Sequence, residues 1–132
     1  MKKAIEHFKN NISSNFVVVG SWALVVAGGF NIVPVDVDIE IDITDADLIK
    51  KLRVLESASK KVYNNYDEAK RIDFEYQGFR FNAFLVENSL RGFIWKDYIK
   101  YSTVIEVLAF KKKYGRSKDY KAINSIVKEI IG

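Results

Sequence analysis

The sequence predicts a single mixed α+β domain built on one sheet with helices packed against it. The chain has 132 residues, a length typical of one domain with one packed core. Three patterns indicate the class. Residues 16–19 are an apolar, mostly β-branched run typical of a buried strand, residues 36–43 alternate acidic and apolar side chains, and the last third carries apolar residues at helical spacing. Helices and strands interleave along the chain, which favours helices packed on a sheet.

The first half of the chain supplies two of the expected strands. A short amphipathic helix over residues 2–11 has Ile5 and Phe8 at helical spacing. The strand over residues 16–19 ends at Gly20-Ser21, and a second helix over residues 22–27 ends at a glycine pair. After Pro34 the strand over residues 36–43 has one apolar face, and Thr44 is the expected N-cap of a helix from about residue 45 to 57.

The second half is expected to contain a hairpin and two helices. A strand is expected over residues 61–66, followed by a hairpin of residues 71–77 and 79–86 that turns near Gln77-Gly78. A helix over residues 103–114 has Gly115 as its expected C-cap. The last helix begins near Ser117, and its apolar positions are Tyr120, Ile123, Ile126, Val127, Ile130 and Ile131.

Composition excludes several kinds of chemistry. The chain has no cysteine and one histidine, so disulfides, thiolate sites, a Ser-His-Asp triad and multi-histidine zinc sites lack their parts. His7 is expected to be an exposed residue of a helix. The formal net charge of +4 permits anionic substrates without requiring them. The uncharged segment 16–35 is interrupted by glycines, Asn31 and Pro34, which disfavours a membrane span, and we expect the protein in the cytoplasm.

Four acids occupy one face of the strand over residues 36–43. Asp36, Asp38, Glu40 and Asp42 alternate with apolar residues, and same-face neighbours lie about 6.5–7 Å apart, where like charges repel. The face is therefore either well solvated or neutralised by a cation. In the second reading Asp36 and Asp38 bind Mg²⁺, which prefers carboxylate oxygens and substrate phosphates, while Glu40 and Asp42 are solvated or bind Lys or Arg.

The Gly20-Ser21 pair can be a plain turn or part of an anion site. Gly20 permits a sharp strand-to-helix turn, and the free backbone N–H groups at the start of a helix favour an anion such as phosphate. No Gly-Lys-Ser/Thr follows, so the turn is not a P-loop. Its value lies in its pairing with Asp36 and Asp38 of the next strand.

Together these residues resemble the nucleotidyltransferase superfamily, which has the DNA polymerase β-like fold. The match consists of a strand ending in Gly-Ser, a helix, and Asp-hydrophobic-Asp on the next strand. The segment Gly20-Ser21-Trp22-Ala23-Leu24 is similar to AbiEii-type and aminoglycoside-type members. A second block, Phe110-Lys111 through Gly115-Arg116-Ser117-Lys118-Asp119, resembles the K…GR.KD segment of AbiEii-like members. The two blocks cover about half of the chain.

The resemblance implies a reaction and a set of roles. Family members transfer a nucleoside monophosphate from a nucleoside triphosphate (NTP) to an acceptor and release pyrophosphate. By this resemblance Gly20 and Ser21 hold the β- and γ-phosphates, and Asp36 and Asp38 are catalytic metal ligands. Lys111 adds a positive charge to the phosphates, although it equally fits a solvated run of three lysines. The acceptor implied is a small molecule, RNA or protein.

One position departs from the family pattern. A third carboxylate is expected on a later strand, but the matching position holds Asn82, which can bind a metal through its carbonyl and cannot take a proton. Asp73 or Glu75, on the neighbouring arm of the hairpin, are possible substitutes. Otherwise the chain is a catalytically weakened binding module, such as one half of a toxin–antitoxin or phage-defence pair.

Aromatic residues near position 95 offer a further alternative. Phe93, Trp95, Tyr98 and Tyr101 lie among Arg91, Lys96 and Lys100. Interleaved aromatic and basic residues can stack on and attract nucleic acid, and the same pattern suits a core-facing helix or loop with charged flanks.

Overall fold

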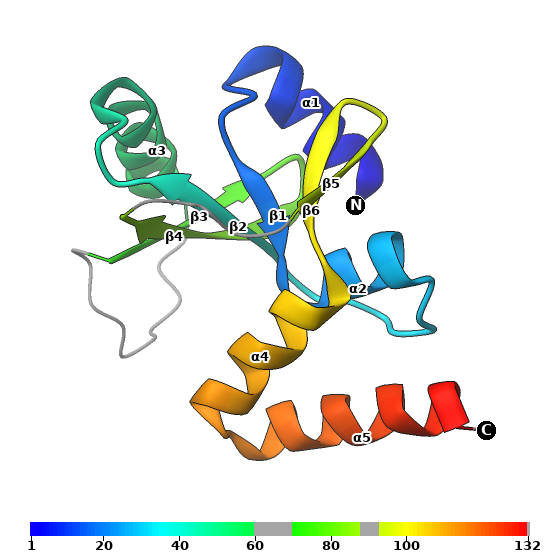
Figure 1. Cartoon of the computed structure of the whole chain (residues 1–132). Helices are drawn as coiled ribbons and strands as arrows, with labels where there is room; N and C mark the ends of the chain where they lie inside the picture. Colours follow the sequence, from blue (N-terminus) through cyan, green and yellow to red (C-terminus); the bar gives the residue numbers. More distant parts are fainter. Residues whose placement is uncertain (60–69, 88–92, 132) are drawn as a thin grey trace.

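A computed structural model describes residues 1–59, 70–87 and 93–131 (Figure 1). The elements in these residues follow one another as α1 (Lys2–Asn11), β1 (Val17–Val19), α2 (Gly20–Gly28), β2 (Val37–Asp42), α3 (Ala46–Ala58), β3 (Arg71–Tyr76), β4 (Phe79–Val86), β5 (Phe93–Lys96), β6 (Ile99–Ser102), α4 (Val104–Tyr114) and α5 (Ser117–Ile131).

The described strands form one mixed sheet in the order β3-β4-β2-β1-β6-β5. Strand β1 is antiparallel to β2 and parallel to β6, and β2 is parallel to β4. The two hairpins, β3–β4 and β5–β6, form opposite ends of the sheet. The predicted α+β class with a single mixed sheet is therefore confirmed.

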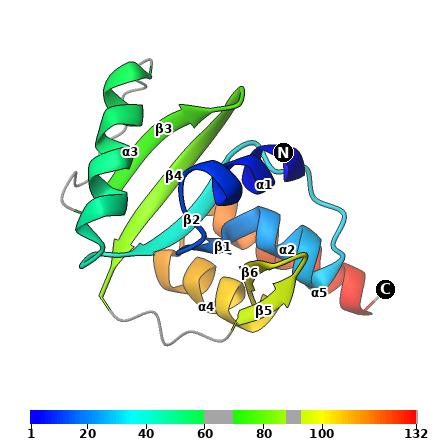
Figure 2. The same ribbon diagram turned by 90° about the horizontal axis from the view of Figure 1, so that it is seen from above.

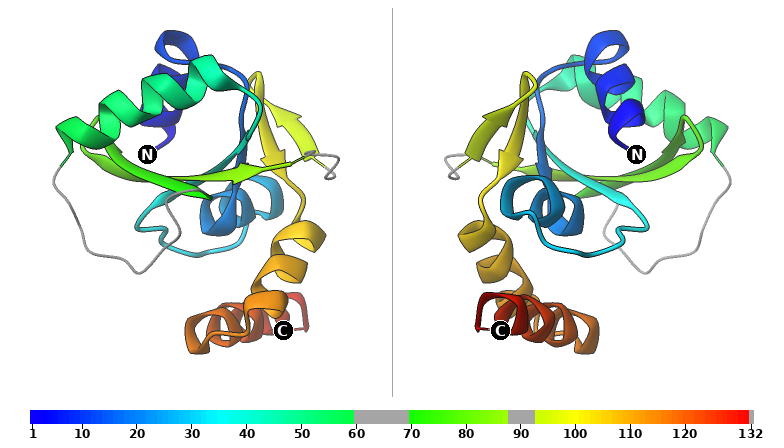
Figure 3. Two further views of the ribbon diagram at one scale, coloured as in Figure 1. Left: turned by 90° about the vertical axis from the view of Figure 1, so that its left-hand side faces the viewer. Right: turned by 90° about the vertical axis from the view of Figure 1, so that its right-hand side faces the viewer.

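Helices α1 and α3 cover one face of the sheet, and α2, α4 and α5 lie on the other side (Figure 3). Under α1 and α3, the apolar positions of β2 and β4 meet a buried aromatic group. The rings of Phe8, Phe74 and Phe81 stack with centroids 5.3–5.9 Å apart. Seen from above, α1 and α3 lie over the same side of the sheet (Figure 2). We call this side the core face.

The opposite side, which we call the polar face, carries the other set of alternating side chains. Asp38 and Glu40 of β2 and Asn82 of β4 belong to it, because they alternate with core residues such as Ile39 and Ala83. A smaller apolar cluster, formed by Ala23, Leu24, Val107 and Ile126, joins α2, α4 and α5 on this side. Helices α2, α4 and α5 thus cover only part of the polar face, and α2 begins directly after β1.

Two sequence-based expectations about local structure were wrong. The N-cap of α3 is Asp45, whose Oδ1 accepts a hydrogen bond from the backbone N–H of Leu48 at 3.2 Å. Thr44 instead donates through its N–H and Oγ1 to Oδ1 of Asp42. Asp42, the last residue of β2, therefore holds Thr44 in a turn, and the next acid, Asp45, is the N-cap.

The aromatic segment near position 95 also differs from both expected structures, helix and loop. It forms the hairpin β5–β6, in which Trp95 pairs with Lys100, while Tyr101 is buried in the core. In α5, Ile126 is buried, whereas Tyr120, Val127, Ile130 and Ile131 are exposed. The expected strand at residues 61–66 and Arg91 lie outside the described residues. Within the described parts of the chain, none of the helices has the length and apolar character needed to cross a membrane.

Candidate functional site

Four strands bring the expected site residues into one row across the sheet. The register pairs Val19 of β1 with Asp38 of β2, Asp38 with Asn82 of β4, and Asn82 with Asp73 of β3. Because β1 ends at Val19, Gly20 and the start of α2 follow directly beside Asp38. Residues that are distant in sequence therefore meet on the polar face.

Asn82 joins the two aspartates. Its Nδ2 atom donates to Oδ1 of Asp38 at 2.8 Å and to Oδ2 of Asp36 at 3.3 Å. One donor reaching two carboxylates means that oxygens of Asp36 and Asp38 face a common point. Asn82 is buried, with 5% of its surface exposed, so this amide has a defined place in the site.

Gly20 lies against Asp38. Its φ is +68°, and a Cβ atom added to it would lie 2.5 Å from Oδ2 of Asp38. Gly20 is the first residue of α2, and the N-cap of this helix, Val19, makes no side-chain capping bond. The start of α2, where free backbone N–H groups favour an anion, thus lies beside Asp38. The phosphate cradle itself stays a prediction. Ser21 is partly exposed at the second position of this helix.

We expect Gly20→Ala to lower the free energy of unfolding and also to weaken any ligand binding at Asp38. The left-handed backbone costs about 1 kcal/mol for a residue with a side chain, and the new methyl group displaces the Asp38 carboxylate. Gly29→Ala is the matched control, because Gly29 has φ +67° with nothing within 4 Å of an added Cβ. Thermal unfolding should show a larger loss for Gly20→Ala, and equal losses would contradict the close contact.

The surroundings of Asp38 in the folded protein disfavour its ionised form. Burial raises the pKa of Asp38 above the ordinary 3.8, the hydrogen bond from Asn82 lowers it, and neighbouring Asp36 raises it further. Positive charges on Arg71 and Lys111 oppose the rise. A cation placed between Asp36 and Asp38 would favour the ionised form of Asp38 and so oppose the rise in its pKa.

Lys111 of α4 is close enough to Asp38 for the two charges to interact. Burial lowers the pKa of Lys111, while Asp119 and Asp38 raise it in part. Lys111 is half-buried, unlike the exposed Lys112 and Lys113 that follow it. Of the two readings of Lys111, a solvated member of the lysine run does not fit its half-buried position, and its charge acts on Asp38. Its role toward phosphates stays a prediction.

Arg116, in the turn between α4 and α5, pairs with Asp119 in the first turn of α5. Burial opposes the charge of Asp119, but hydrogen bonds from the Arg116 side chain and backbone hold its pKa below 3.8 overall. The Nε atom of Arg116 lies 2.7 Å from Oδ2 of Asp119. Asp119 is buried near the start of α5. Its negative charge favours the protonated form of Lys111, so the Arg116–Asp119 pair holds a carboxylate close to that lysine.

Asp73 pairs in register with Asn82 and could therefore supply a third carboxylate, but two arginines donate hydrogen bonds to both of its oxygens. Nε and Nη2 of Arg71 donate to its two oxygens at 2.7 and 3.0 Å, and Nη2 of Arg80 donates to Oδ2 at 2.9 Å. Nε of Arg80 also donates to Oδ1 of Asn82 at 3.3 Å. Glu75 is exposed and pairs in register with Arg80, two residues along β3 from Asp73.

The residues present fit a divalent cation with an incomplete ligand set. Asp36 and Asp38 supply hard oxygens facing one point, and the carbonyl oxygen of Asn82 could be added by rotation of its side chain. Within residues 1–59, 70–87 and 93–131, no group of three or more His, Cys, Asp or Glu side chains could hold a metal ion. The site thus suits an ion whose remaining ligands come from substrate phosphates and water.

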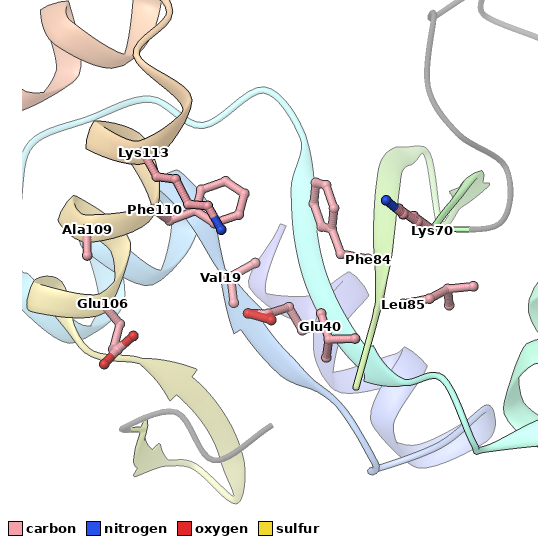
Figure 4. A pocket seen from close by; sticks show the side chains of 10 residues that line it. Val19, Glu40, Lys70, Phe84, Leu85, Glu106, Ala109, Phe110 and Lys113 are labelled. Carbon is pink, nitrogen blue, oxygen red and sulfur yellow. The ribbon is translucent and has the colours of Figure 1, made fainter. Parts of the chain in front are cut away.

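A cleft of about 320 Å³ opens on the same face, between α4 and the sheet. Figure 4 shows Phe84 and Phe110 projecting from opposite walls, with Val19 and Glu40 between the walls. Glu40 is 5% exposed, so of its two expected states the solvated one is wrong, and binding to Lys or Arg stays a prediction. Asp42 is exposed, as the solvated alternative expects. Since Glu40 and Phe84 lie two residues beyond Asp38 and Asn82, the cleft adjoins the row of site residues.

Arg71 and Arg80 were not predicted as site residues. The available signal was the period-two pattern of the hairpin, which places Arg71, Asp73, Arg80 and Asn82 on one face once the register is known. The sequence alone does not fix that register or the order of the strands in the sheet. The position of Arg71 and Arg80 near Asn82 could therefore not be derived from the spacing of residues in the sequence.

The sequence and the structure were compared with those of known proteins. No protein-family model matches the sequence, and no curated protein matches it. Among solved structures, the chain is similar to JHP933 from Helicobacter pylori, with 14% sequence identity over 84% of this chain and 56% of that chain, at a TM-score of 0.48. The chain therefore spans little more than half the length of that protein.

Proposed function

We propose that this protein is a Mg²⁺-dependent nucleotidyltransferase that transfers a nucleoside monophosphate from an NTP to an acceptor hydroxyl and releases pyrophosphate. One observation carries the proposal: the glycine that starts α2 touches Asp38, whose carboxylate shares the Asn82 amide with Asp36. This contact supports the proposal, because a metal-bound triphosphate needs an anion-binding helix start next to the carboxylates that hold its cation. We place this activity in the cytoplasm.

Each residue of the site has a role in this reaction. The N–H groups at Gly20 and Ser21 bind the β- and γ-phosphates, and Lys111 adds a positive charge beside them. Asp36 and Asp38 hold Mg²⁺, which when bound neutralises the triphosphate and aligns the attacking and leaving oxygens. The acceptor oxygen bonds to the α-phosphorus while the bond from that phosphorus to pyrophosphate breaks. The acceptor proton passes to water, because Asn82 cannot take it.

A second candidate is a nucleotidyltransferase-like module that binds a partner and transfers slowly or not at all. It is favoured by Asn82 in place of a carboxylate and by the engagement of both Asp73 oxygens with arginines. The partner would be the cognate half of a toxin–antitoxin or phage-defence pair. The two candidates differ in whether Asp36 and Asp38 are needed for what the protein does.

Thermal unfolding with each of the four NTPs, with and without Mg²⁺, tests the proposal. A ligand at one hundred times its dissociation constant stabilises the folded state by about 2.7 kcal/mol, so we expect at least one NTP to raise the unfolding temperature by several degrees only when Mg²⁺ is present. The rise should vanish in Asp36→Ala. No rise with any NTP, or a rise that EDTA does not remove, would contradict the proposal.

A further inference from the structure

The hairpin β5–β6 carries two aromatic side chains on the polar face of the sheet. Lys100 of β6 pairs in register with Val17 of β1, which pairs with Glu40 of β2. Residues paired in register lie on one face, so Lys100 shares the polar face with Glu40. The Nζ atom of Lys100 lies over the rings of Phe93 and Trp95, 5.3 and 5.2 Å from their centroids. We call Phe93, Trp95 and Lys100 the aromatic platform.

The other face of the hairpin is packed against the protein, which holds the platform in place. Tyr101 is 2% exposed, whereas Phe93 and Trp95 are 39% and 62% exposed. The two exposed rings meet edge to face, with 5.9 Å between their centroids. The turn of the hairpin is also tied to α1, because Nζ of Lys2 lies 3.1 Å from Oδ2 of Asp97. The platform is therefore a positioned surface that leaves both rings accessible to a ligand.

The platform lies level with the candidate site. Phe93 pairs in register with Ser102 of β6, and Val19 of β1 pairs with Asp38. Since β1 and β6 are parallel and Lys100 pairs with Val17, Ser102 is level with Val19, and Phe93 is level with Asp38. Three spacings between neighbouring strands separate β5 from β2, which is about 14 Å of sheet. A chain molecule of a few units can therefore reach from the platform to the site.

The chemistry of the platform fits a single-stranded nucleic acid. Exposed aromatic rings stack on unpaired bases, and a lysine beside them attracts the backbone phosphate. Among the residues that the structure describes, none forms an ion pair with Lys100. An apolar protein surface seated on the rings would bury the Lys100 ammonium group, which is costly. A base with its phosphate covers the rings and neutralises the lysine at the same time.

Acidic residues on the inner side of Lys100 limit where a phosphate can bind. Glu40, Asp42 and Asp45 line a hollow of about 290 Å³ together with Lys100. Their charges repel a phosphate from that side of the lysine. The opposite side is β5, the outermost strand of the sheet, where both rings lie. The phosphate is therefore expected over the hairpin, beside the base that stacks on Trp95.

We propose that the aromatic platform binds a single-stranded nucleic acid on the face that carries the candidate site. This rests on the proposed function in one respect, which is that the bound strand is the acceptor. In that reaction the oxygen of a terminal hydroxyl bonds to the α-phosphorus, pyrophosphate leaves, and the hydroxyl proton passes to water. Single-strand sites in proteins span about 4–16 nucleotides, which is enough to join the platform to Asp38.

Binding of a labelled octanucleotide, followed by fluorescence anisotropy in EDTA without NTP, tests the platform. RNA and DNA octamers of one sequence are compared with each other and with the duplex. Trp95→Leu is the test variant, because leucine keeps an apolar side chain and removes the ring, and Trp95→Phe restores a ring. Ile94→Ala is the control on the same strand, because Ile94 pairs with Tyr101 on the other face and is 39% exposed. Lys100→Gln is compared with Lys50→Gln on α3, which changes the charge equally on the core face.

We expect Trp95→Leu to weaken single-strand binding at least about fivefold, the lower end of what one base–aromatic stack contributes. Trp95→Phe should keep most of the affinity, and Ile94→Ala should change it less than about twofold. Lys100→Gln should reduce the slope of log affinity against log salt by about 0.7, the value for one phosphate contact on a single strand. Lys50→Gln should leave that slope unchanged. Tighter binding of the RNA or of the DNA octamer identifies the sugar that the platform prefers, and either supports the proposal.

Three outcomes would overturn the platform as a nucleic-acid site. A wild-type protein that binds neither octamer at about 0.1 mM, the weak end of non-specific binding, would leave a protein partner as the occupant. Unchanged affinity in Trp95→Leu, or an equal loss in Ile94→Ala, would exclude stacking on the ring. A duplex that binds as tightly as the single strands would show that unpaired bases are not recognised.

The acceptor role and the proposed function fail in different measurements. If no NTP raises the unfolding temperature while the octamer binds through Trp95, the proposed function fails and the platform remains a binding surface. If NTP and octamer both bind with Mg²⁺ present but the octamer gains no nucleotide, the strand is not the acceptor. Extension of the octamer that decreases in Trp95→Leu and persists in Ile94→Ala would support the acceptor role.

Discussion

Asp38→Asn is expected to abolish nucleotidyl transfer and at the same time to raise the unfolding temperature of the metal-free protein. Removing this carboxylate leaves one charged ligand for Mg²⁺, and the lost charge stabilisation of several kcal/mol corresponds to a decrease in rate of about a thousandfold or more. The same change removes a buried negative charge beside Asp36. We expect a gain of about 0.5–2 kcal/mol in the free energy of unfolding in EDTA.

The pH dependence gives this stability gain a defined sign. Burial and, to a smaller extent, Asp36 raise the pKa of Asp38 in the folded state above 3.8, so the folded protein binds a proton more tightly than the unfolded chain. Wild-type stability therefore falls as pH rises from 3.8 through the raised pKa. The advantage of Asp38→Asn should be full at neutral pH and disappear below about pH 4, as thermal melts across this range will show.

Asp42→Asn is the matched control on the same strand and face. The backbone and side-chain hydrogen bonds from Thr44 lower the pKa of Asp42, so its ionised form stabilises the folded state above the ordinary pKa. This variant should therefore lose stability at neutral pH and leave NTP binding intact. A loss of stability in Asp38→Asn at neutral pH in EDTA, or full transfer activity, would contradict the role given to Asp38.

Local patterns were enough to predict most elements and the carboxylate half of the site. The period-two alternation predicted a strand over residues 36–43; β2 spans Val37–Asp42 and includes Asp38, while Asp36 lies in the bend just before it. The glycine after an apolar run placed the turn at Gly20. These predictions rest on neighbours within a few residues, where backbone periodicity decides which face a side chain occupies. They needed no knowledge of which strands are adjacent.

The features that the sequence did not predict, the β5–β6 hairpin and the surroundings of Asp73, depend on strand pairing. The hairpin β5–β6 carries apolar and charged residues in a short segment, and its turn at Asp97 and Tyr98 uses positive φ without glycine, so no turn signal marked it. Sequence spacing likewise could not show that Asp73 pairs with Asn82 and is occupied by two arginines. The neutralised state of Asp73 therefore had to come from the sheet register.

Asn82→Asp is the change that distinguishes an enzyme from a binding module. It places a third carboxylate in the row with Asp38, where it can bind metal and accept the acceptor proton. General base catalysis typically contributes 10²–10⁴-fold, so we expect transfer to rise tenfold or more over the wild type. Arg80, which donates to Asn82 Oδ1, would hold the introduced carboxylate ionised and in place.

The same substitution should make folding depend on metal. The Asn82 amide now donates to Asp36 and Asp38, and replacing it by a carboxylate removes both hydrogen bonds and adds a third negative charge. The unfolding temperature should therefore fall in EDTA and recover with Mg²⁺, while Asn82→Ala, which adds no charge, should show less recovery. A metal-stabilised variant without increased transfer would favour the binding module, because the site would then bind the cation while the reaction remained absent.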